Sequence, residues 1–267
     1  MKLVPSAGII SCSIRTLPRF RVVRAQSVED AMRALSAEPS AAVLAGGTDL
    51  PARINEGFAP ALVVDISRID DLRRIGLSDG AIEIGAAVTH AAGSSDPLVR
   101  QHLPAFARAW ARIANVRVRM SATLGGNLMA HRTRYEGAIL LAALGARLRL
   151  ATAAGETLIA AEECFEAPAG CLLKSIVIPL RKGLQLDYER SMRPVLTQAV
   201  ALDAAGFGRV VTATEFVRPR VQDLIGGAPA GGVLSDLPFG DPVASDGYIE
   251  RMRAVFLARQ LERMRTT

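Results

Sequence analysis

The sequence predicts an α+β fold in which two α/β parts are followed by a smaller domain of antiparallel strands and helices. Up to residue 180, short apolar strand patterns alternate with helical patterns, whereas three strand patterns follow RKG (residues 181–183) with no helix between them. With 267 residues, half of them hydrophobic, the chain is long enough to bury a substantial core. We expect a tail at 1–17, a first domain at 18–182 with subdomains 18–60 and 61–182, and a C-terminal domain at 183–267.

The first subdomain begins with a predicted helix. Ser27, three residues before Asp30, and an apolar pattern at helical spacing indicate a capped helix of about three turns. AAVL predicts a short buried strand that runs into AGGTDL, after which residues 50–55 can form a helix. LVVDI predicts another strand, and IDDLRR a helical turn.

The second subdomain is predicted to open with a β-hairpin, because Asp-Gly in SDG separates RRIGL from the alternating AIEIGA. LPAFARAWARI predicts a helix with Pro104 in its first turn and Trp110 in the core. A second helix is predicted at 136–144. RLRLAT, AGETL and SIVIPL predict strands. Arg117 and Arg119 suggest a solvated strand face, or alternatively one of them faces a partner subunit or a phosphate.

The C-terminal domain is predicted to be a sheet covered by one helix. LQLDYERS, VLTQAVALDAAG and GRVVTATEFV indicate three antiparallel strands, with a turn at 204–206. A loop rich in Gly and Pro is expected at 226–242, and apolar residues at steps of three and four predict a final amphipathic helix at 246–264.

Composition excludes several classes of function. The net charge of +6 is spread along the chain and aromatic residues make up only 4%, so we expect no nucleic-acid binding. The longest apolar stretch, AILLAALGA, is too short to span a bilayer. Cys12, Cys164 and Cys171 share no CxxC spacing, which argues against a disulfide framework or a metal site and favours a reducing compartment. With no clear signal peptide, we expect a cytoplasmic protein.

AGGTDL (residues 45–50) is the first segment that can carry chemistry. Two glycines after a strand let the backbone approach a ligand closely, and successive N–H groups can form an anion-binding nest. The alternative is a tight turn in which Asp49 caps the next helix. The segment is neither a P-loop nor a GxGxxG fingerprint, so a P-loop kinase or a standard Rossmann dehydrogenase is not supported.

TLGGN (residues 123–127) repeats this chemistry with a hydroxyl, a glycine pair and a side-chain amide. Two glycine-pair loops suit a ligand with two phosphates, because each loop can offer N–H donors to a pyrophosphate from one side. Their coincidence favours a dinucleotide site.

These segments, read together, resemble a known family. FRVVRAQSVEDAMRALSAEPSAAVLAGGTDLPARINEG, LVVDISRIDDLRRIG, IEIGAAVTH and VRVRMSATLGGNLMAH follow one another as in the FAD-binding medium subunit of the molybdenum hydroxylases. That group includes the flavin parts of xanthine dehydrogenase, carbon monoxide dehydrogenase and aldehyde oxidoreductases. The resemblance is strong over about residues 18–180 and weak beyond, and it implies an FAD-binding domain of the PCMH type.

The resemblance also implies site residues. The first loop would hold the pyrophosphate, and the second would lie along the diphosphate and the flavin. The implied FAD contacts in the two loops are Ala45, Gly46, Gly47, Thr48, Asp49 and Leu50, and Thr123, Gly125, Gly126 and Asn127. Thr89 in AAVTH matches a further contact, Glu136 stands where the family has a ribose-binding aspartate, and Tyr188 matches an aromatic residue near the flavin ring.

Other interpretations accompany these roles. Without the family, Glu136 reads as an acid favoured at a helix start. His90 reads as a packed or capping histidine, and His102 as a surface residue. His131 is expected near the ligand only as a lesser alternative. The family usually has proline at Thr133, and HRTRYEG is unusually basic for this loop.

The implied function is that of a flavin electron-transfer subunit. Electrons from a molybdenum cofactor on a large subunit would pass through two [2Fe-2S] clusters of a small subunit to FAD, and then to an external acceptor, in a heterotrimer or a dimer of heterotrimers. No catalytic residue and no metal ligand is predicted in this chain. The alternatives are a self-contained flavin oxidase and an interaction subunit that has lost its flavin.

Overall fold

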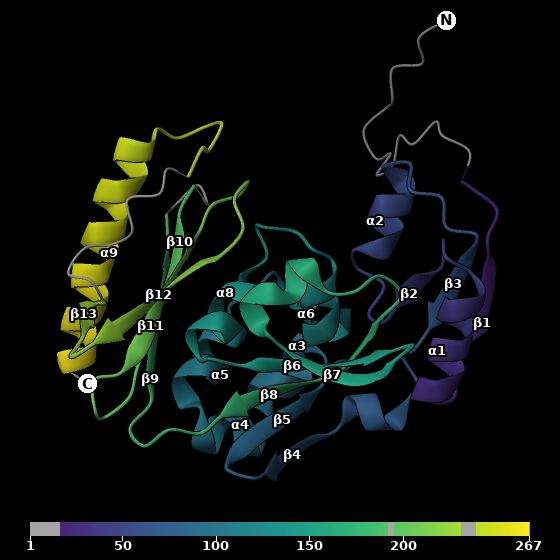
Figure 1. The fold of residues 1–267 in the computed structure, drawn as a ribbon, viewed down its shortest axis with the longest axis horizontal. Helices are drawn as coiled ribbons and strands as arrows, with labels where there is room; N and C mark the ends of the chain where they lie inside the picture. The colour runs from purple at the N-terminus through teal and green to yellow at the C-terminus, as the bar shows by residue number, and fades with distance from the viewer. Residues whose placement is uncertain (1–16, 192–194, 231–238, 267) are drawn as a thin grey trace, which may run out of the picture.

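The computed structural model describes residues 17–191, 195–230 and 239–266, so nearly all of the predicted tail lies outside the described residues. Three parts lie side by side (Figure 1): a small parallel sheet with its helices, a central sheet with several short helices, and a C-terminal sheet covered by a long helix. The α+β fold class predicted from the sequence is confirmed.

The first part is a three-stranded parallel sheet of order β1-β3-β2, formed by Arg21–Arg24, Leu62–Asp65 and Ala42–Leu44. The Ser27 hydroxyl accepts from the Asp30 amide at 3.1 Å and caps α1, Val28–Ala37, as predicted. Helix α2, Leu50–Asn55, follows the first glycine pair. The central strand, β3, follows shortly after residue 60, where the boundary between the two subdomains is predicted.

The second part is built on a five-stranded antiparallel sheet of order β4-β5-β8-β6-β7. Asp79 and Gly80, with φ of 48° and 73°, form the tight turn of the predicted β4–β5 hairpin. The strands are Ile75–Ser78, Ala81–Gly85, Leu172–Pro179, Arg147–Thr152 and Gly155–Ala160, and two short 3-10 helices are formed by Asp70–Arg73 and Ala161–Glu166.

Short helices fill the long connection from β5 to β6. They are α3 His90–Ser95, α4 Pro97–His102, α5 Pro104–Trp110, α6 Val116–Ser121, α7 Leu124–Met129 and α8 Glu136–Ala143. Trp110 is fully buried, as predicted. The strand expected around Arg117 and Arg119 is wrong: Asn115 accepts from the Val118 amide at 3.0 Å and starts helix α6 there. Each of the unpredicted helices is only six residues long, so its periodicity is too brief to read.

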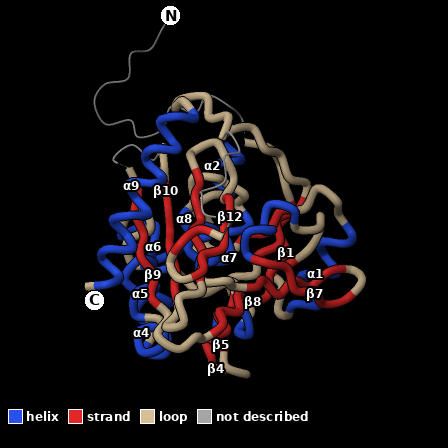
Figure 2. Tube along the Cα trace, turned by 60° about the vertical axis from the view of Figure 1, so that its left-hand side comes forward, coloured by secondary structure: helices blue, strands red, loops and turns tan. Residues whose placement is uncertain are grey.

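The C-terminal part is a five-stranded antiparallel sheet of order β13-β12-β11-β10-β9 with helix α9 on one face. Figure 2 shows α9 running beside β9 and β10. The three predicted strands are present, whereas β12 and the short β13 were not predicted, and β13 lies in the segment expected to be a loop. The elements are Gln185–Arg190, Thr197–Leu202, Gly208–Ala213, Arg220–Ile225, Ala228–Pro229 and α9 Asp246–Arg265.

Helix α8 joins the second and third parts. Residues 137–143 are all buried, because the central part packs on one side and β10 and β11 on the other. Ala199 and Ala201 of β10 share a core with α8, while Val200 between them packs against Leu257 of α9. Strand β10 is therefore buried on both faces, and small residues let α8 approach closely.

A buried amide pair holds α9 against the sheet. Gln198 and Gln260 are both fully buried, and Gln198 Nε2 donates to Gln260 Oε1 at 3.0 Å. Gln260 Nε2 donates to the carbonyl oxygens of Asp187 and Gln198 at 3.2 and 3.1 Å, and Thr212 Oγ1 donates to Gln198 Oε1 at 3.2 Å. Buried polar groups stabilise only while their partners remain.

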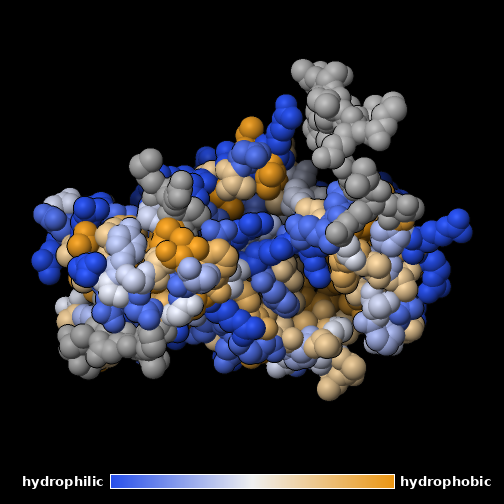
Figure 3. Space-filling model, turned by 90° about the horizontal axis from the view of Figure 1, so that it is seen from above, coloured by the Kyte–Doolittle hydropathy of each residue, from blue (hydrophilic) through white to orange (hydrophobic). Residues whose placement is uncertain are grey.

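In the part of the chain that the structure describes, no helix is both long and apolar enough to cross a bilayer. Figure 3 shows hydrophilic residues over much of one face, with apolar residues scattered between them.

We expect Gln260→Leu to lower the free energy of unfolding by about 2 kcal/mol, because Gln198 loses a buried partner and two carbonyls lose a donor. Urea denaturation followed by circular dichroism measures the change. Glu262→Gln, at an exposed position of the same helix, is the control and should stay within about 0.5 kcal/mol of the wild type. Equal stability of the two variants would contradict the role of the amide pair.

Candidate functional site

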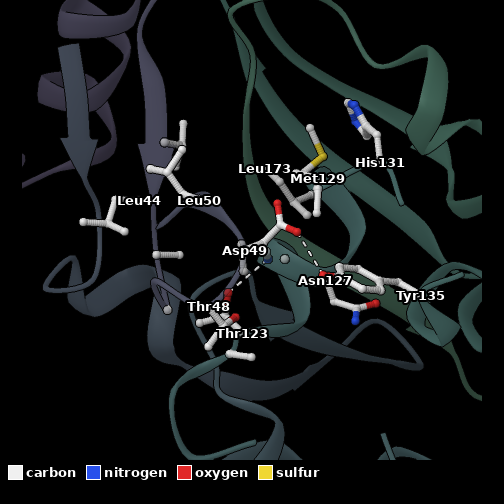
Figure 4. Close-up of a pocket in the computed structure, with 18 of the residues that line it drawn as sticks. Leu44, Thr48, Asp49, Leu50, Thr123, Asn127, Met129, His131, Tyr135 and Leu173 are labelled. Atoms are coloured by element: carbon white, nitrogen blue, oxygen red, sulfur yellow. Dashed lines mark hydrogen bonds between the residues drawn. The ribbon is translucent and has the colours of Figure 1, made fainter. Parts of the chain in front are cut away.

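A cavity of about 730 Å³ lies where the three parts of the fold meet. Its walls come from the end of β2 and the start of α2, from α7 and the loop after it, from the loop before β8, and from β9 and β10. Figure 4 shows the first two walls facing each other across it. Eleven of the thirteen predicted site residues line the cavity: Ala45, Gly46, Gly47, Thr48, Asp49, Leu50, Thr123, Gly125, Gly126, Asn127 and Glu136.

The first glycine pair leaves β2 in a turn whose amides are unpaired. Gly47 has φ of +66°, which favours glycine. Among the described residues, no acceptor receives a hydrogen bond from the amides of residues 46–49. Gly46 also lies directly against the chain before α7, where an added Cβ would stand 2.0 Å from the carbonyl oxygen of Ser121. The turn therefore combines close packing with free donors.

The second glycine pair is not a loop, as the sequence suggested, but the first turn of α7. The Thr123 hydroxyl accepts from the Gly126 amide at 3.0 Å and caps the helix. The amides of Leu124 and Gly125 donate to the carbonyl oxygens of Val88 and Ala86, both at 3.0 Å. These amides already donate hydrogen bonds within the chain. This segment therefore contributes side chains and close packing to the cavity rather than free amides.

Asp49 is held from across the cavity rather than capping α2. Its Oδ1 accepts from Tyr135 Oη at 2.9 Å and from Arg132 Nε at 3.3 Å, and the first of these bonds is drawn in Figure 4. Arg132 Nη2 also donates to Glu56 at 3.0 Å. Burial and the Asp49 carboxylate raise the pKa of Tyr135. The basic segment after α7 thus clamps the first wall to the second.

Glu136 begins α8 beside the cavity and pairs with the C-terminal domain. Its Oε1 accepts from Arg190 Nη1 of β9 at 2.8 Å, and the Glu136 side chain is 14% exposed. Nearby, Asn127 Oδ1 accepts from the Gly137 amide at 3.0 Å. The ion pair with Arg190 engages Oε1, so the second carboxylate oxygen can accept from a ligand hydroxyl.

Thr89 and Tyr188 do not line the cavity. Thr89 caps α3 by accepting from the Ala92 amide at 3.2 Å, and it forms a β-bridge with Thr123. Tyr188 packs against the central core, and its buried hydroxyl makes no hydrogen bond within the described chain. Burial and the nearby Glu136 raise the pKa of this phenol. On the same face of β9, two residues further along, Arg190 is the side chain that reaches the cavity.

His90 is a packed histidine, as the sequence suggested. It is 1% exposed, and its Nδ1 accepts from Trp110 Nε1 at 2.6 Å. Burial and the charge of Arg119 lower its pKa to about 4. His131, with φ of +52°, lies at the cavity beside Phe165. Its pKa is lowered mainly by burial and secondly by the charge of Arg53.

Several cavity residues escaped the sequence reasoning. Arg53, Arg134 and Tyr135 line it, as does the segment 167–173 before β8. The unusually basic segment HRTRYEG was the one signal that pointed to two of them, Arg134 and Tyr135. Arg53 gave no signal, because a single arginine on a short helix reads as surface. Among the described residues no cluster of three or more metal-ligating side chains occurs.

Cavities of this size at domain junctions commonly hold cofactors, and runs of unpaired amides favour anionic groups. The family described as the FAD binding domain in molybdopterin dehydrogenase matches residues 18–181. The chain therefore belongs to this family of FAD-binding domains.

Curated relatives agree with the family. The chain is 31% identical over 153 residues to the nicotine 6-hydroxylase medium subunit of Paenarthrobacter nicotinovorans, covering 57% of this chain and 54% of that one. It is 27% identical over 191 residues to the glyceraldehyde dehydrogenase medium chain of Sulfolobus acidocaldarius, covering 69% and 68%. The matches thus span about half to two thirds of these relatives' length.

The fold is shared with solved structures. A reconstituted CO dehydrogenase from Oligotropha carboxidovorans superposes with a TM-score of 0.81 at 24% identity, covering 94% of this chain and 99% of that one. Quinoline 2-oxidoreductase from Pseudomonas putida 86 gives 0.79 at 22% identity, covering 94% and 98%. The C-terminal sheet and helix therefore belong to the shared fold, although sequence resemblance there is weak.

We expect Gly46→Ala to lower the free energy of unfolding by about 3 kcal/mol or more, because backbone on both sides must move to admit the new Cβ. Gly76→Ala is the matched control, since nothing lies within 4 Å of its added Cβ, and it should cost less than about 0.5 kcal/mol. Chemical denaturation compares the two. A Gly46 variant as stable as the Gly76 variant would contradict the close approach.

His90 predicts a pH dependence of stability. The unfolded chain protonates this imidazole near its ordinary pKa of 6.5, whereas the folded chain does so only near 4. As pH falls through that window, its contribution to the free energy of unfolding drops by about 1.4 kcal/mol per pH unit. Urea titrations at several pH values should give a shallower slope for His90→Gln than for the wild type. Identical slopes would contradict the assignment.

Proposed function

We propose that this chain binds FAD in the cavity and serves as the electron-transfer subunit of a molybdenum-containing dehydrogenase. The observation that carries this proposal is the run of unpaired amides at residues 46–49 on the wall of a cavity of about 730 Å³, in a chain of the FAD-binding family. Amides of this kind suit the phosphates of a dinucleotide.

The residues present fit such a cofactor. Gly46 and Gly47 place no side chain between the turn and a ligand, and Thr48 adds a hydroxyl to the same wall. Glu136 offers a carboxylate oxygen to a ribose hydroxyl from the opposite wall. The cavity volume lies within the range of cofactor sites, roughly 300–1,000 Å³.

FAD, when bound, supplies the redox chemistry, and the chain supplies binding, orientation and electrostatics. The turn at 46–49 would hold the diphosphate, and Glu136 would fix the adenosine end. Asp49 would act indirectly, because its carboxylate is engaged by Arg132 and Tyr135 and holds the two walls together. The predicted ring contact of Tyr188 is the least supported of these roles, because Tyr188 packs in the core and Arg190 takes its place at the cavity.

The partners follow from the same proposal. We propose a large subunit with the molybdenum cofactor and a small subunit with two [2Fe-2S] clusters as the source of electrons, with an external acceptor beyond the flavin. Its support is that relatives are named as medium subunits of hydroxylases and dehydrogenases. A dimer of heterotrimers and a cytoplasmic location stay predictions.

We expect the purified chain to bind added FAD, measured by quenching of flavin fluorescence. Glu136→Gln should weaken FAD binding about tenfold, because an ionised acceptor binds a hydroxyl more strongly than an amide does. Riboflavin lacks the adenosine end, so its binding should not change. Glu250→Gln, exposed on α9, is the control.

Three outcomes separate the alternatives. Absence of any FAD binding would leave an interaction subunit without flavin. Direct reduction of the bound flavin by an organic substrate, with no partner present, would favour a self-contained oxidase. Glu136→Gln with wild-type FAD affinity would return Glu136 to a helix-start residue paired with Arg190.

A further inference from the structure

The side chains that line the cavity carry more positive than negative charge. Its charged lining residues with fixed sign are two acids and three arginines: Asp49, Glu136, Arg53, Arg134 and Arg190. Both acids are already paired, Asp49 with Arg132 and Glu136 with Arg190. Two arginines of the wall therefore remain uncompensated.

Arg53 and Arg134 come from different parts of the fold. Arg53 is half-buried on α2, where its guanidinium lies 4.4 Å from the centre of the Phe58 ring. Arg134 is exposed in the basic loop between α7 and α8. Within the described chain neither forms an ion pair or a hydrogen bond through its guanidinium. A ring face leaves the edge donors of a guanidinium available.

The charge of Arg53 affects a titratable group that lines the cavity. After burial, it is the largest cause of the lowered pKa of His131, which lines the same cavity from the wall formed by α7 and the loop after it. The guanidinium of Arg53 therefore contributes positive potential at the cavity, and such a potential attracts an anion.

The first amides of helix α7 are not available to bind an anion. Its first amides are engaged by Val88, Ala86 and Thr123, so of the two glycine-pair segments in the described chain, the turn at 46–49 is the one with unpaired amides. A diphosphate carries two negative charges, and charged donors bind it more strongly than amides do.

We propose that Arg53 and Arg134 bind the diphosphate of the dinucleotide from the two opposite walls and take the place of the amides that α7 uses internally. This inference rests on the proposed function, which it extends to the recognition of a nucleoside diphosphate by side chains. The two arginines belong to subdomains already joined by Arg132 and Asp49, so the ligand would close the same junction.

The test uses Arg53→Gln, Arg134→Gln and the double variant in the full chain, with Arg108→Gln, exposed on α5, as the control. Circular dichroism and thermal denaturation establish that each variant folds. Binding of FAD and of riboflavin is measured by fluorescence at low and high salt. Inorganic pyrophosphate binding is measured by calorimetry.

Each single variant should bind FAD about tenfold more weakly at low salt, and the difference should shrink at high salt, where the charges are screened. Riboflavin binding should be unchanged, and the double variant should lose most of the wild-type affinity for pyrophosphate. A double variant with wild-type FAD affinity and salt dependence would overturn the inference. An equal loss of riboflavin binding would also overturn it, because the arginines would then act on the fold or the ring.

The two proposals fail separately. If the wild type binds no FAD, the proposed function fails, and the pyrophosphate titration still decides the arginine pair. If the wild type binds FAD and the double variant binds pyrophosphate as the wild type does, only the arginine assignment fails.

Discussion

The contact between Gly46 and the backbone of Ser121 and Ala122 is the constraint on which the cavity depends. A Cβ on Gly46 would stand 2.0 Å from the Ser121 carbonyl oxygen, so only glycine lets the first subdomain come this near to the second. Gly125 repeats the device one layer deeper, where an added Cβ would stand 2.6 Å from the carbonyl oxygen of Ala86. The glycine pairs therefore set how closely the walls approach.

Polar side chains then fasten the walls together. Arg132 and Tyr135 engage Asp49, Thr133 donates to the carbonyl oxygen of Glu215, and Arg190 pairs with Glu136. These bonds link the segment 132–136 to both other parts of the fold. Because the same segment borders the cavity, the shape of the cavity and the relative placement of the three parts depend on one short stretch of chain.

The C-terminal domain adds support from behind. The alanines of β10 let it pack on α8, and the Gln198–Gln260 pair holds α9 on the opposite face. Helix α8 is consequently enclosed, and its first residue, Glu136, is presented to the cavity from a rigid element. The packing around α8 thus fixes where the Glu136 carboxylate lies.

The sequence by itself determined the local elements and the family: the Ser27 cap, the Asp79–Gly80 hairpin, helix α8 and the glycine pairs can all be read from neighbouring residues, because caps, turns and periodicity are local. Tertiary structure alone decided how the site residues are used. Asp49 became a bridge instead of a cap, and the second glycine pair became a helix start whose amides are taken, because partners more than 30 residues distant in sequence compete for the same groups. The uncompensated charge of Arg53 and Arg134 likewise emerges only when the acids of the wall find other partners.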